Sequence, residues 1–216
     1  QWQRLGEPDL LITSVGRLTD QKVLLLRQTL EDGRTVLEHL LLHCQRHCGD
    51  IRLLIIGSGD PVISDEFRQL AGRYPQLLFL DGYNEPLAQQ IFVQGDLFLM
   101  PSSFEPCGIS QLLAMRAGQL CLVHGVGGLQ DTVQNGETGF VFRGVDLADQ
   151  AQTLLMTFAQ AINQYGSREW QSMQQRIADL QFSWSAQVER YCSELYQFEP
   201  SVESESLIPC ALVAHH

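Results

Sequence analysis

The sequence predicts an α/β protein built on a doubly wound parallel sheet. Short apolar runs alternate along the chain with longer segments that have helical character. Within each run the residues are apolar throughout, without alternating polar ones, as is typical of strands covered by helices on both faces. Polar or glycine-rich turns follow several of these runs. These observations together favour a sheet whose strand ends carry the functional groups.

The first half of the chain supplies strands and helices in alternation. Gly16 ends the first apolar run, the glycines and proline of residues 57–61 end the second, and Pro75 precedes the third. The strands expected here are the apolar runs at residues 10–15, 53–56 and 77–80. The helices expected here lie at residues 35–47, 66–74 and 85–94.

The second half continues the alternation and then becomes helical. Strands are expected at residues 97–100, 120–123 and 138–142. Helices are expected at residues 111–118, where Gly118 is the stop signal, and at 146–164, 167–180 and 185–198. The predicted domain therefore covers residues 1–198, and residues 199–216, which contain Pro, Ser and Glu, are expected to form an irregular tail.

Composition excludes several classes of protein. The 216 residues are 44% hydrophobic and 18% charged, which is ordinary for a globular domain with a substantial core. A net charge of -11 argues against a nucleic-acid partner, which would require a basic face. No apolar run approaches the ~20 residues of a membrane span, and no signal peptide is recognisable. Six cysteines are too few for a disulfide scaffold, so a reducing compartment is expected.

Two histidine–cysteine pairs are the only candidates for a metal site. His43-Cys44 and His47-Cys48 repeat at helical spacing. No second cluster supplies the remaining ligands that a zinc site normally has, so packing of a helix explains the repeat better. No metal is therefore expected.

Residues 101–112, Pro-Ser-Ser-Phe-Glu-Pro-Cys-Gly-Ile-Ser-Gln-Leu, form the most informative segment. They join a strand to a helix, and in α/β proteins ligands bind where strands end and helices begin. Glu105 stands in this turn, where a carboxylate can accept hydrogen bonds from the hydroxyl groups of a ligand. The alternative is that Glu105 only caps the following helix, and the local pattern does not decide between the two.

Two further turns follow expected strands. Residues 16–22 place Arg17 and Lys22 before a helix, an arrangement that suits a phosphate, although both could be solvated surface cations. Residues 124–133 contain glycines that allow a ligand to approach the backbone closely, although they could also form a plain tight turn. Since a parallel sheet gathers the carboxyl ends of its strands at one edge, we expect Arg17, Lys22 and Glu105 to meet there. Cations for a diphosphate and a carboxylate for sugar hydroxyls are what a sugar nucleotide requires.

Five segments in order, at residues 16–22, 57–61, 82–85, 101–111 and 127–133, resemble one family. It is the family of bacterial glycogen synthases and plant starch synthases. Phe-Glu-Pro-Cys-Gly followed by Gln-Leu is specific to it among retaining glycosyltransferases. The resemblance extends from about residue 10 to about residue 196 and implies a GT-B fold, in which two Rossmann-like domains face each other. This sequence is similar to the C-terminal, nucleotide-sugar-binding domain, and the N-terminal domain that holds the α-glucan acceptor is expected to be absent from it.

The resemblance also implies the roles of individual residues. Arg17 and Lys22 would bind the diphosphate and stabilise it as it leaves, and Glu105 would hold the glucose. Tyr83 would stack on the base. The other residues implied in donor binding are Cys107, Gly108, Ile109, Ser110, Gly127, Gly128 and Leu129.

Five positions depart from the family pattern. His124-Gly125-Val126 replaces Arg-x-Thr, so that a cation and a hydroxyl are missing before the Gly-Gly-Leu segment. Ser103 replaces an arginine, Val23 a glycine and Ser110 a threonine. These changes would weaken donor binding or mark a divergent member of the family.

The function implied is the transfer of glucose, with retention, from ADP-glucose or a related sugar nucleotide to the non-reducing end of an α-1,4-glucan. No cofactor is implied, since no Asp-x-Asp pair suggests a divalent metal, and a bacterial cytoplasm is expected rather than a plastid. One alternative is a non-catalytic relative that binds a glucan or a partner. The other is an unrelated cofactor domain such as a dehydrogenase, against which stands the absence of Gly-x-Gly-x-x-Gly after the first strand.

Overall fold

The computed structural model describes residues 6–180, 188–189 and 191–197. The chain divides into two units, Gln1–Leu180 and Gln181–His216. In the second unit the structure describes a π-helical segment, Tyr191–Leu195. Most of the helix expected at 185–198, and all of the tail expected at 199–216, lie outside the described residues.

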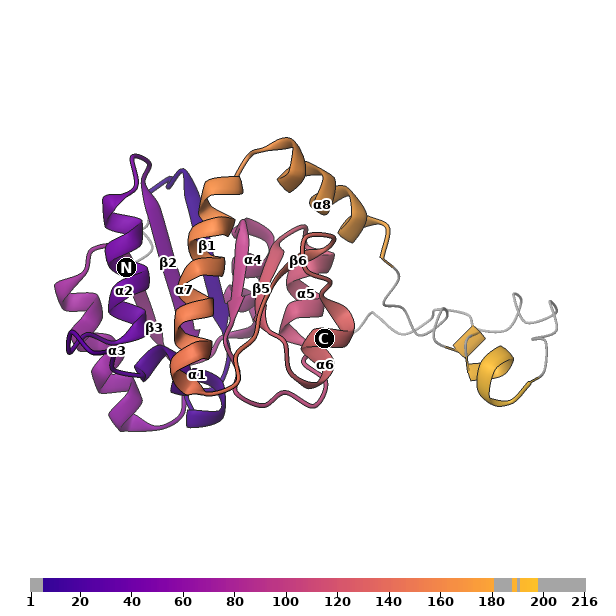
Figure 1. The fold of residues 1–216 in the computed structure, drawn as a ribbon, viewed down its shortest axis with the longest axis horizontal. Helices are drawn as coiled ribbons and strands as arrows, with labels where there is room; N and C mark the ends of the chain where they lie inside the picture. Colours follow the sequence, from indigo (N-terminus) through magenta and orange to yellow (C-terminus); the bar gives the residue numbers. More distant parts are fainter. Residues whose placement is uncertain (1–5, 181–187, 190, 198–216) are drawn as a thin grey trace, which may run out of the picture. The chain divides into compact units, whose positions relative to one another are not determined.

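The first unit is built on a parallel sheet of six strands in the order β3-β2-β1-β4-β5-β6 (Figure 1). The strands are β1 (Leu10–Val15), β2 (Ile51–Gly57), β3 (Leu77–Asp81), β4 (Leu97–Met100), β5 (Leu120–His124) and β6 (Gly139–Phe142). The chain runs outward from β1 to β3 and then crosses back to β4, beside β1. The doubly wound sheet predicted from the sequence is therefore confirmed.

Helices cover the sheet on both faces. They are α1 (Asp20–Arg27), α2 (Val36–Arg46), α3 (Pro61–Arg73), α4 (Glu85–Gln94), α5 (Ser110–Arg116), α6 (Gly127–Thr132), α7 (Leu147–Gln164) and α8 (Arg168–Ala178). Helix α7 packs against α1 and α2, and α5 packs against α4 and α8; α7 lies in front of the strands in Figure 1. Every residue of β4 and β5 is buried, which requires cover on both faces because successive side chains point in opposite directions.

Local sequence signals explain where most helices begin. Thr35 and Glu38 form a capping box at the start of α2. Helix α3 begins at Pro61, five residues earlier than the sequence pattern suggested, because the Asp60 side chain accepts a hydrogen bond from the Val62 amide at 2.7 Å. Proline at the first helical position costs no hydrogen bond, so the residue interpreted as a strand-ending turn also starts a helix.

Polar groups buried at the amino end of the central strands are satisfied within the protein. The Thr13 hydroxyl donates to Gln119 Oε1 at 2.7 Å. The Gln119 amide group donates in turn to the carbonyl oxygens of Ile91 and Phe92, at 2.8 and 2.6 Å. Both polar side chains are fully buried, and this network therefore fastens α4 to the sheet.

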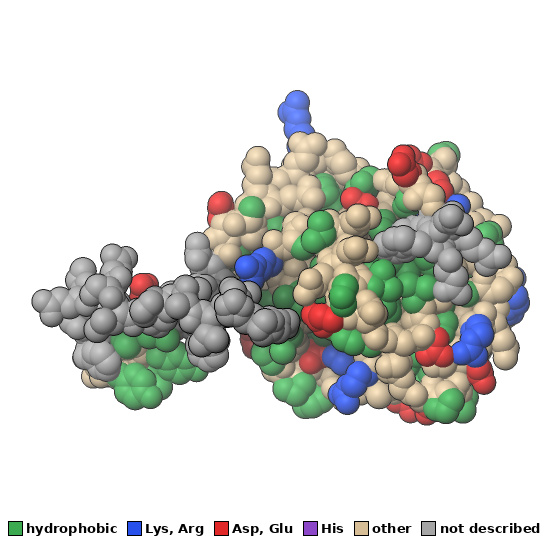
Figure 2. All heavy atoms as spheres, turned by 180° about the vertical axis from the view of Figure 1, so that it is seen from behind, with side chains coloured by type: hydrophobic (Ala, Val, Ile, Leu, Met, Phe, Trp, Pro, Cys, Tyr) green, Lys and Arg blue, Asp and Glu red, His purple; other side chains and the backbone are tan. Residues whose placement is uncertain are grey.

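The surface of the first unit has charges of both signs. Figure 2 shows basic side chains, in blue, interspersed with acidic ones, in red, on the face opposite to that of Figure 1, with no continuous basic patch among the residues described. Within the described ranges, no helix has the length and apolar character needed to cross a membrane. The same residues contain no group of three or more His, Cys, Asp or Glu that could hold a metal ion.

Candidate functional site

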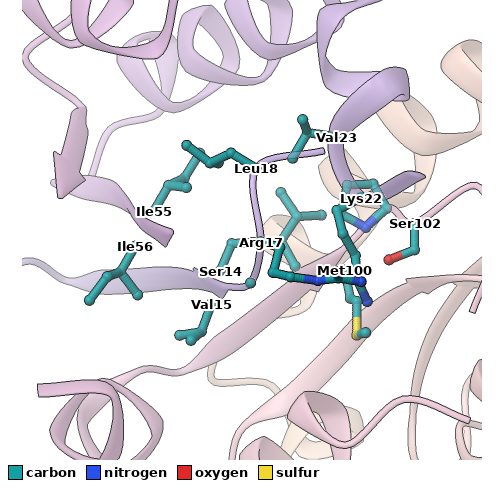
Figure 3. Close-up of a pocket in the computed structure, with 13 residues that line it drawn as sticks. Ser14, Val15, Arg17, Leu18, Lys22, Val23, Ile55, Ile56, Met100 and Ser102 are labelled. Atoms are coloured by element: carbon teal, nitrogen blue, oxygen red, sulfur yellow. The ribbon is translucent and has the colours of Figure 1, made fainter. Parts of the chain in front are cut away.

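A small hollow lies at the carboxyl ends of β1 and β4, where the two halves of the sheet meet. This is the topological switch point, the place where open α/β sheets bind ligands. Its volume is about 20 Å³. Residues from both strands and from the turn after β1 line it, among them Ser14, Gly16, Arg17, Lys22, Met100 and Ser102 (Figure 3).

Lys22 and Glu105 form an ion pair beside this hollow. Lys22 Nζ donates to Glu105 Oε2, although the two residues are 83 positions apart in the sequence. Both side chains are largely buried, at 19% and 10% exposure. Helix α5 begins only at Ser110, and its first turn receives no side-chain cap, so the interpretation of Glu105 as a helix cap is wrong.

Three hydrogen bonds hold the β4–α5 loop against the first turn of α1. The Ser103 amide and hydroxyl both donate to the Gln21 carbonyl, at 2.9 and 3.1 Å. The Gln21 side chain donates to the Phe104 carbonyl at 2.8 Å. Ser103, which replaces the arginine of the family pattern, therefore fastens the loop that carries Glu105 to the segment that carries Lys22.

Arg17 lines the same hollow but remains exposed. Among the residues that the structure describes, no carboxylate forms an ion pair with its guanidinium. At this edge of the sheet the structure thus brings Lys22 together with Glu105, and Arg17 together with Lys22, while the roles of the three residues stay predictions. Among the described residues, this edge therefore has one cation without an ion-pair partner, Arg17, and one cation in an ion pair, Lys22 with Glu105.

The loop from Cys107 to Ser110 lies next to Glu105. Gly108 has a φ of +76°, a left-handed conformation that other residues rarely adopt. The Gln111 side chain fixes this turn by donating to the carbonyl oxygens of Cys107 and Gly108, at 3.2 and 2.9 Å. Cys107 and Ile109 are exposed, and Ser110 is half-buried, so the loop presents these three side chains at the carboxyl edge.

The β5–α6 turn approaches this loop so closely that only glycine fits. A Cβ atom on Gly127 would overlap the Glu105 carbonyl, and one on Gly128 would overlap the Cys107 backbone. The Gly128 amide donates to the Glu105 carbonyl at 3.0 Å, and the Leu129 amide donates to Val126 at 3.1 Å. Since both amides have partners within the protein and the Leu129 side chain is buried, these residues shape the site through packing; contact with a ligand stays a prediction.

His124 lies in the core rather than in the site. Its side chain is buried, stacks on Phe142 with ring centroids 4.8 Å apart, and donates from Nδ1 to the Ser102 carbonyl at 2.9 Å. Burial lowers the pKa of His124, so the ring is neutral at physiological pH. The strand that carries it is apolar throughout, a signal by which sequence analysis could have identified this structural role.

Arg143, a cation that the sequence did not point to, lies near the β5–α6 turn. A Cβ atom on Gly125 would meet the Arg143 side chain, so the Arg143 guanidinium covers this glycine. Arg143 directly follows β6, the neighbour of β5 in the sheet. The cation expected at position 124 is therefore absent from β5, while another is supplied from β6.

Tyr83 stands apart from the cluster formed by Arg17, Lys22 and Glu105. It lies in the turn after β3, the edge strand, and is 60% exposed. Strands are about 4.8 Å apart, so the three intervals from β3 to β4 place this turn roughly 14 Å from the β4 loop. The Tyr83 hydroxyl donates to Glu85, and this hydrogen bond raises the pKa of Tyr83. Its position at the same edge is compatible with contact to a distal part of an extended ligand.

Comparisons with known proteins show which proteins this chain resembles. A family model described as glycosyl transferases group 1 matches residues 10–160. The glycogen synthase of Streptococcus equi subsp. zooepidemicus is 42% identical over 193 residues, which cover 84% of this chain and 38% of that protein. The glycogen synthase of Streptococcus gordonii is 39% identical over 196 residues, with 87% and 38% covered.

Solved structures show the same architecture. The catalytic domain of starch synthase IV from Arabidopsis thaliana, bound to ADP and acarbose, superposes with a TM-score of 0.65 at 25% identity, covering 85% of this chain and 37% of that one. Anabaena HepE in complex with UDP and glucose has a TM-score of 0.60 at 18% identity, with 82% and 44% covered, a likeness of fold alone. The chain thus spans less than half of the length of these relatives.

Proposed function

The chain belongs to the group 1 glycosyl transferases, and we propose that it is the part of such an enzyme that binds the sugar nucleotide. The proposed reaction is transfer of glucose, with retention, from ADP-glucose to the non-reducing end of an α-1,4-glucan. The observation that carries the proposal is the placement of Lys22, Glu105 and Arg17 together at the switch point of the sheet.

The proposed catalysis is electrostatic. As the bond between glucose and the diphosphate breaks, negative charge develops on the departing oxygen, and Arg17 and Lys22 would stabilise it. Fixed charges of this kind are commonly the largest contribution to a rate enhancement, because they need no reorganisation during the reaction. Arg17 is suited to this role because no carboxylate among the described residues neutralises it.

Glu105 would have two tasks. Its carboxylate orients Lys22 through the ion pair and keeps further lone pairs to accept hydrogen bonds from sugar hydroxyls. Because the residue is only 7% exposed, such hydrogen bonds would form with little competition from water. The glucose would then lie between the Glu105 loop and the β5–α6 turn.

Adenine as the base is supported by the relatives. The curated relatives are glycogen synthases, and the starch synthase IV structure contains ADP. HepE binds UDP but resembles this chain in fold alone. ADP-glucose is therefore the proposed donor, and UDP-glucose is the competitor that an experiment must include.

The acceptor would bind through the part of the relatives that this chain does not span, since it covers only 38% of their length. We accordingly expect the chain to bind the donor without extending a glucan. Calorimetric titration with ADP, ADP-glucose, UDP-glucose and NAD tests this, with Arg46→Ala, a change of an exposed cation on α2, as the control. Preferential binding of ADP and ADP-glucose supports the proposal.

Three results would contradict it. Tight binding of NAD alone would indicate a cofactor domain instead. No binding of either adenine ligand at millimolar concentration would favour the non-catalytic relative that the changes at His124 and Val126 suggest. Glucan synthesis by the chain alone would refute the division of the site between two domains.

A further inference from the structure

Ser102 carries a buried hydroxyl group that no group of the described residues satisfies. The residue is 1% exposed, and its Oγ has no hydrogen-bond partner among the described residues. We propose that this hydroxyl donates a hydrogen bond to one oxygen of the donor's diphosphate, so that Ser102 completes an oxyanion subsite with Arg17 and Lys22. The inference rests on the proposed function and adds to it a residue for which the sequence motifs supplied no role.

The position of Ser102 supports a ligand rather than a structural role. It follows β4 directly and lines the hollow at the switch point together with the two cations. Figure 3 shows its hydroxyl oxygen turned toward the side chains of Lys22 and Arg17. An acceptor placed in this hollow would meet a hydroxyl and two positive charges together.

The size of the hollow specifies what can enter. Its volume of about 20 Å³ exceeds the roughly 10–15 Å³ that a cavity needs to hold one water-sized group, and it is far too small for a nucleotide. One phosphoryl oxygen therefore fits, while the remainder of the ligand stays outside, along the exposed Gly16 and Arg17. A negatively charged oxygen is favoured over a neutral one because Arg17 is cationic and the Lys22 ammonium has further donors besides the one in its ion pair with Glu105.

The peptide group between Ser102 and Ser103 is fixed at both of its polar atoms. The Ser102 carbonyl accepts the hydrogen bond from His124, and the Ser103 amide donates to Gln21. The backbone therefore cannot easily reorient to bring the Ser102 hydroxyl to another partner. Burying a hydroxyl group without a hydrogen-bond partner costs free energy. A ligand oxygen that accepts a hydrogen bond from Ser102 would recover part of that cost on binding.

Ser102→Ala tests the proposal in the chain as it exists, and Ser172→Ala is the matched control. Ser172 lies on α8 and does not line the hollow, so the loss of its hydroxyl should leave phosphate binding unchanged. Calorimetry would use ADP and inorganic diphosphate as probes, and thermal unfolding would verify that each variant is folded. We expect Ser102→Ala to weaken the binding of both probes about tenfold, the usual effect of losing one hydrogen bond to a charged group. Ser102→Cys, which keeps most of the volume but donates poorly, should behave likewise if the alanine variant fails to fold.

The outcomes separate this inference from the proposed function. Unchanged affinity for both probes in Ser102→Ala would overturn the subsite and indicate that the hydroxyl binds only a water molecule, while ADP binding by the unmodified chain would still support the function. Binding of inorganic diphosphate but not of ADP or ADP-glucose, weakened by Ser102→Ala, would keep the subsite and reject the function. If the unmodified chain binds none of these probes, both are rejected.

Discussion

Two turns at the same edge of the sheet use their polar residues in opposite ways. At the hollow between β1 and β4, Arg17 has no carboxylate partner and the Ser102 hydroxyl has no hydrogen bond among the described residues. At the end of β5, His124 is buried, stacked and hydrogen-bonded, and Gly125 is covered by Arg143. In the first turn, polar groups of Arg17 and Ser102 have no partner among the described residues and are available to a ligand. In the second turn, the corresponding residues are used for packing within the protein.

This difference separates the residues proposed to recognise a ligand from those that position them. Buried polar groups in proteins normally have partners, as Thr13 and Gln119 do here. An exception beside two cations is a specific indication of a ligand. The β5 turn still matters for the site, because its glycines and His124 fix the loop on which Ser102 and Glu105 lie.

Lys22→Ala should have the largest effect on binding. If it had none, the turn at the hollow would not differ from the β5 turn in binding a ligand. Removing the cation would abolish the proposed charge-assisted contact with the diphosphate, worth about 1.5–3 kcal/mol, so affinity for ADP should fall roughly ten- to hundredfold. The change also leaves Glu105 buried without its partner, so the double variant with Glu105→Ala distinguishes the lost contact from an unpaired carboxylate.

The same residue offers a spectroscopic test, because Lys22 is the only lysine in the sequence. Protein labelled with ¹³C-lysine therefore gives one set of side-chain signals in NMR spectra. Addition of ADP should shift the Cε signal, and addition of adenosine, which has no phosphate, should not. A signal that does not respond to ADP would exclude Lys22 from the binding site.

Gly127→Ala tests whether the β5 turn acts through close packing. Gly127 has a φ of +46°, and an added Cβ would overlap the Glu105 carbonyl, so we expect a loss of about 2–3 kcal/mol in the free energy of unfolding. Gly136→Ala is the matched control: its φ is +75°, but nothing lies within 4 Å of an added Cβ. Denaturant unfolding should show a clearly smaller loss for the control. Equal losses would mean that backbone strain alone, and not contact with the Glu105 loop, requires the glycine.

His124→Phe sharpens the contrast further, because it keeps the stacked ring and removes the hydrogen bond to Ser102. At pH 8 the variant should be less stable by about 1 kcal/mol. Since burial lowers the pKa of His124, its imidazole takes up a proton more readily in the unfolded chain than in the folded one. The stabilisation from neutral His124 is therefore fully present above its ordinary pKa of 6.5 and is lost as the pH falls toward the lowered value.

Unfolding measured from pH 8 to pH 5 should accordingly show a weaker pH dependence in His124→Phe than in the unmodified chain. Burial also lowers the pKa of His43, but that contribution is common to both proteins and cancels in the difference. Parallel profiles would show that His124 is not a buried neutral group and would weaken the contrast between the two turns.

Much of the fold could be predicted because strands buried on both faces have unbroken apolar runs. The expected bounds of β1 and β4 coincide with the observed ones. The start of α3 was missed because Pro61 is compatible with both a turn and a first helical residue. Local patterns thus identify elements well and their ends less well.

The site was predictable only in part, because some of its properties depend on partners distant in sequence. Whether Glu105 caps a helix or pairs with a cation depends on Lys22, 83 positions away. That the Ser102 hydroxyl has no partner follows from how β1, β4 and His124 surround it. No local pattern of residues contains that information.

Tyr83→Ala should have the smallest effect on ADP affinity. It tests whether a third turn, the one after β3, also contacts the ligand. Tyr83 lies beyond β3, roughly 14 Å from the Glu105 loop by strand spacing, and its ring is mostly exposed. If it stacks on the base, its removal should cost about 1 kcal/mol, near the lower end of measured base–aromatic stacking, or about fivefold in ADP affinity. Binding of inorganic diphosphate, which has no base, should not change, and Tyr83→Phe should bind ADP like the unmodified chain because stacking does not need the hydroxyl. Equal losses for ADP and diphosphate would show that Tyr83 acts on the structure of the edge, so that base recognition would have to come from another part of it.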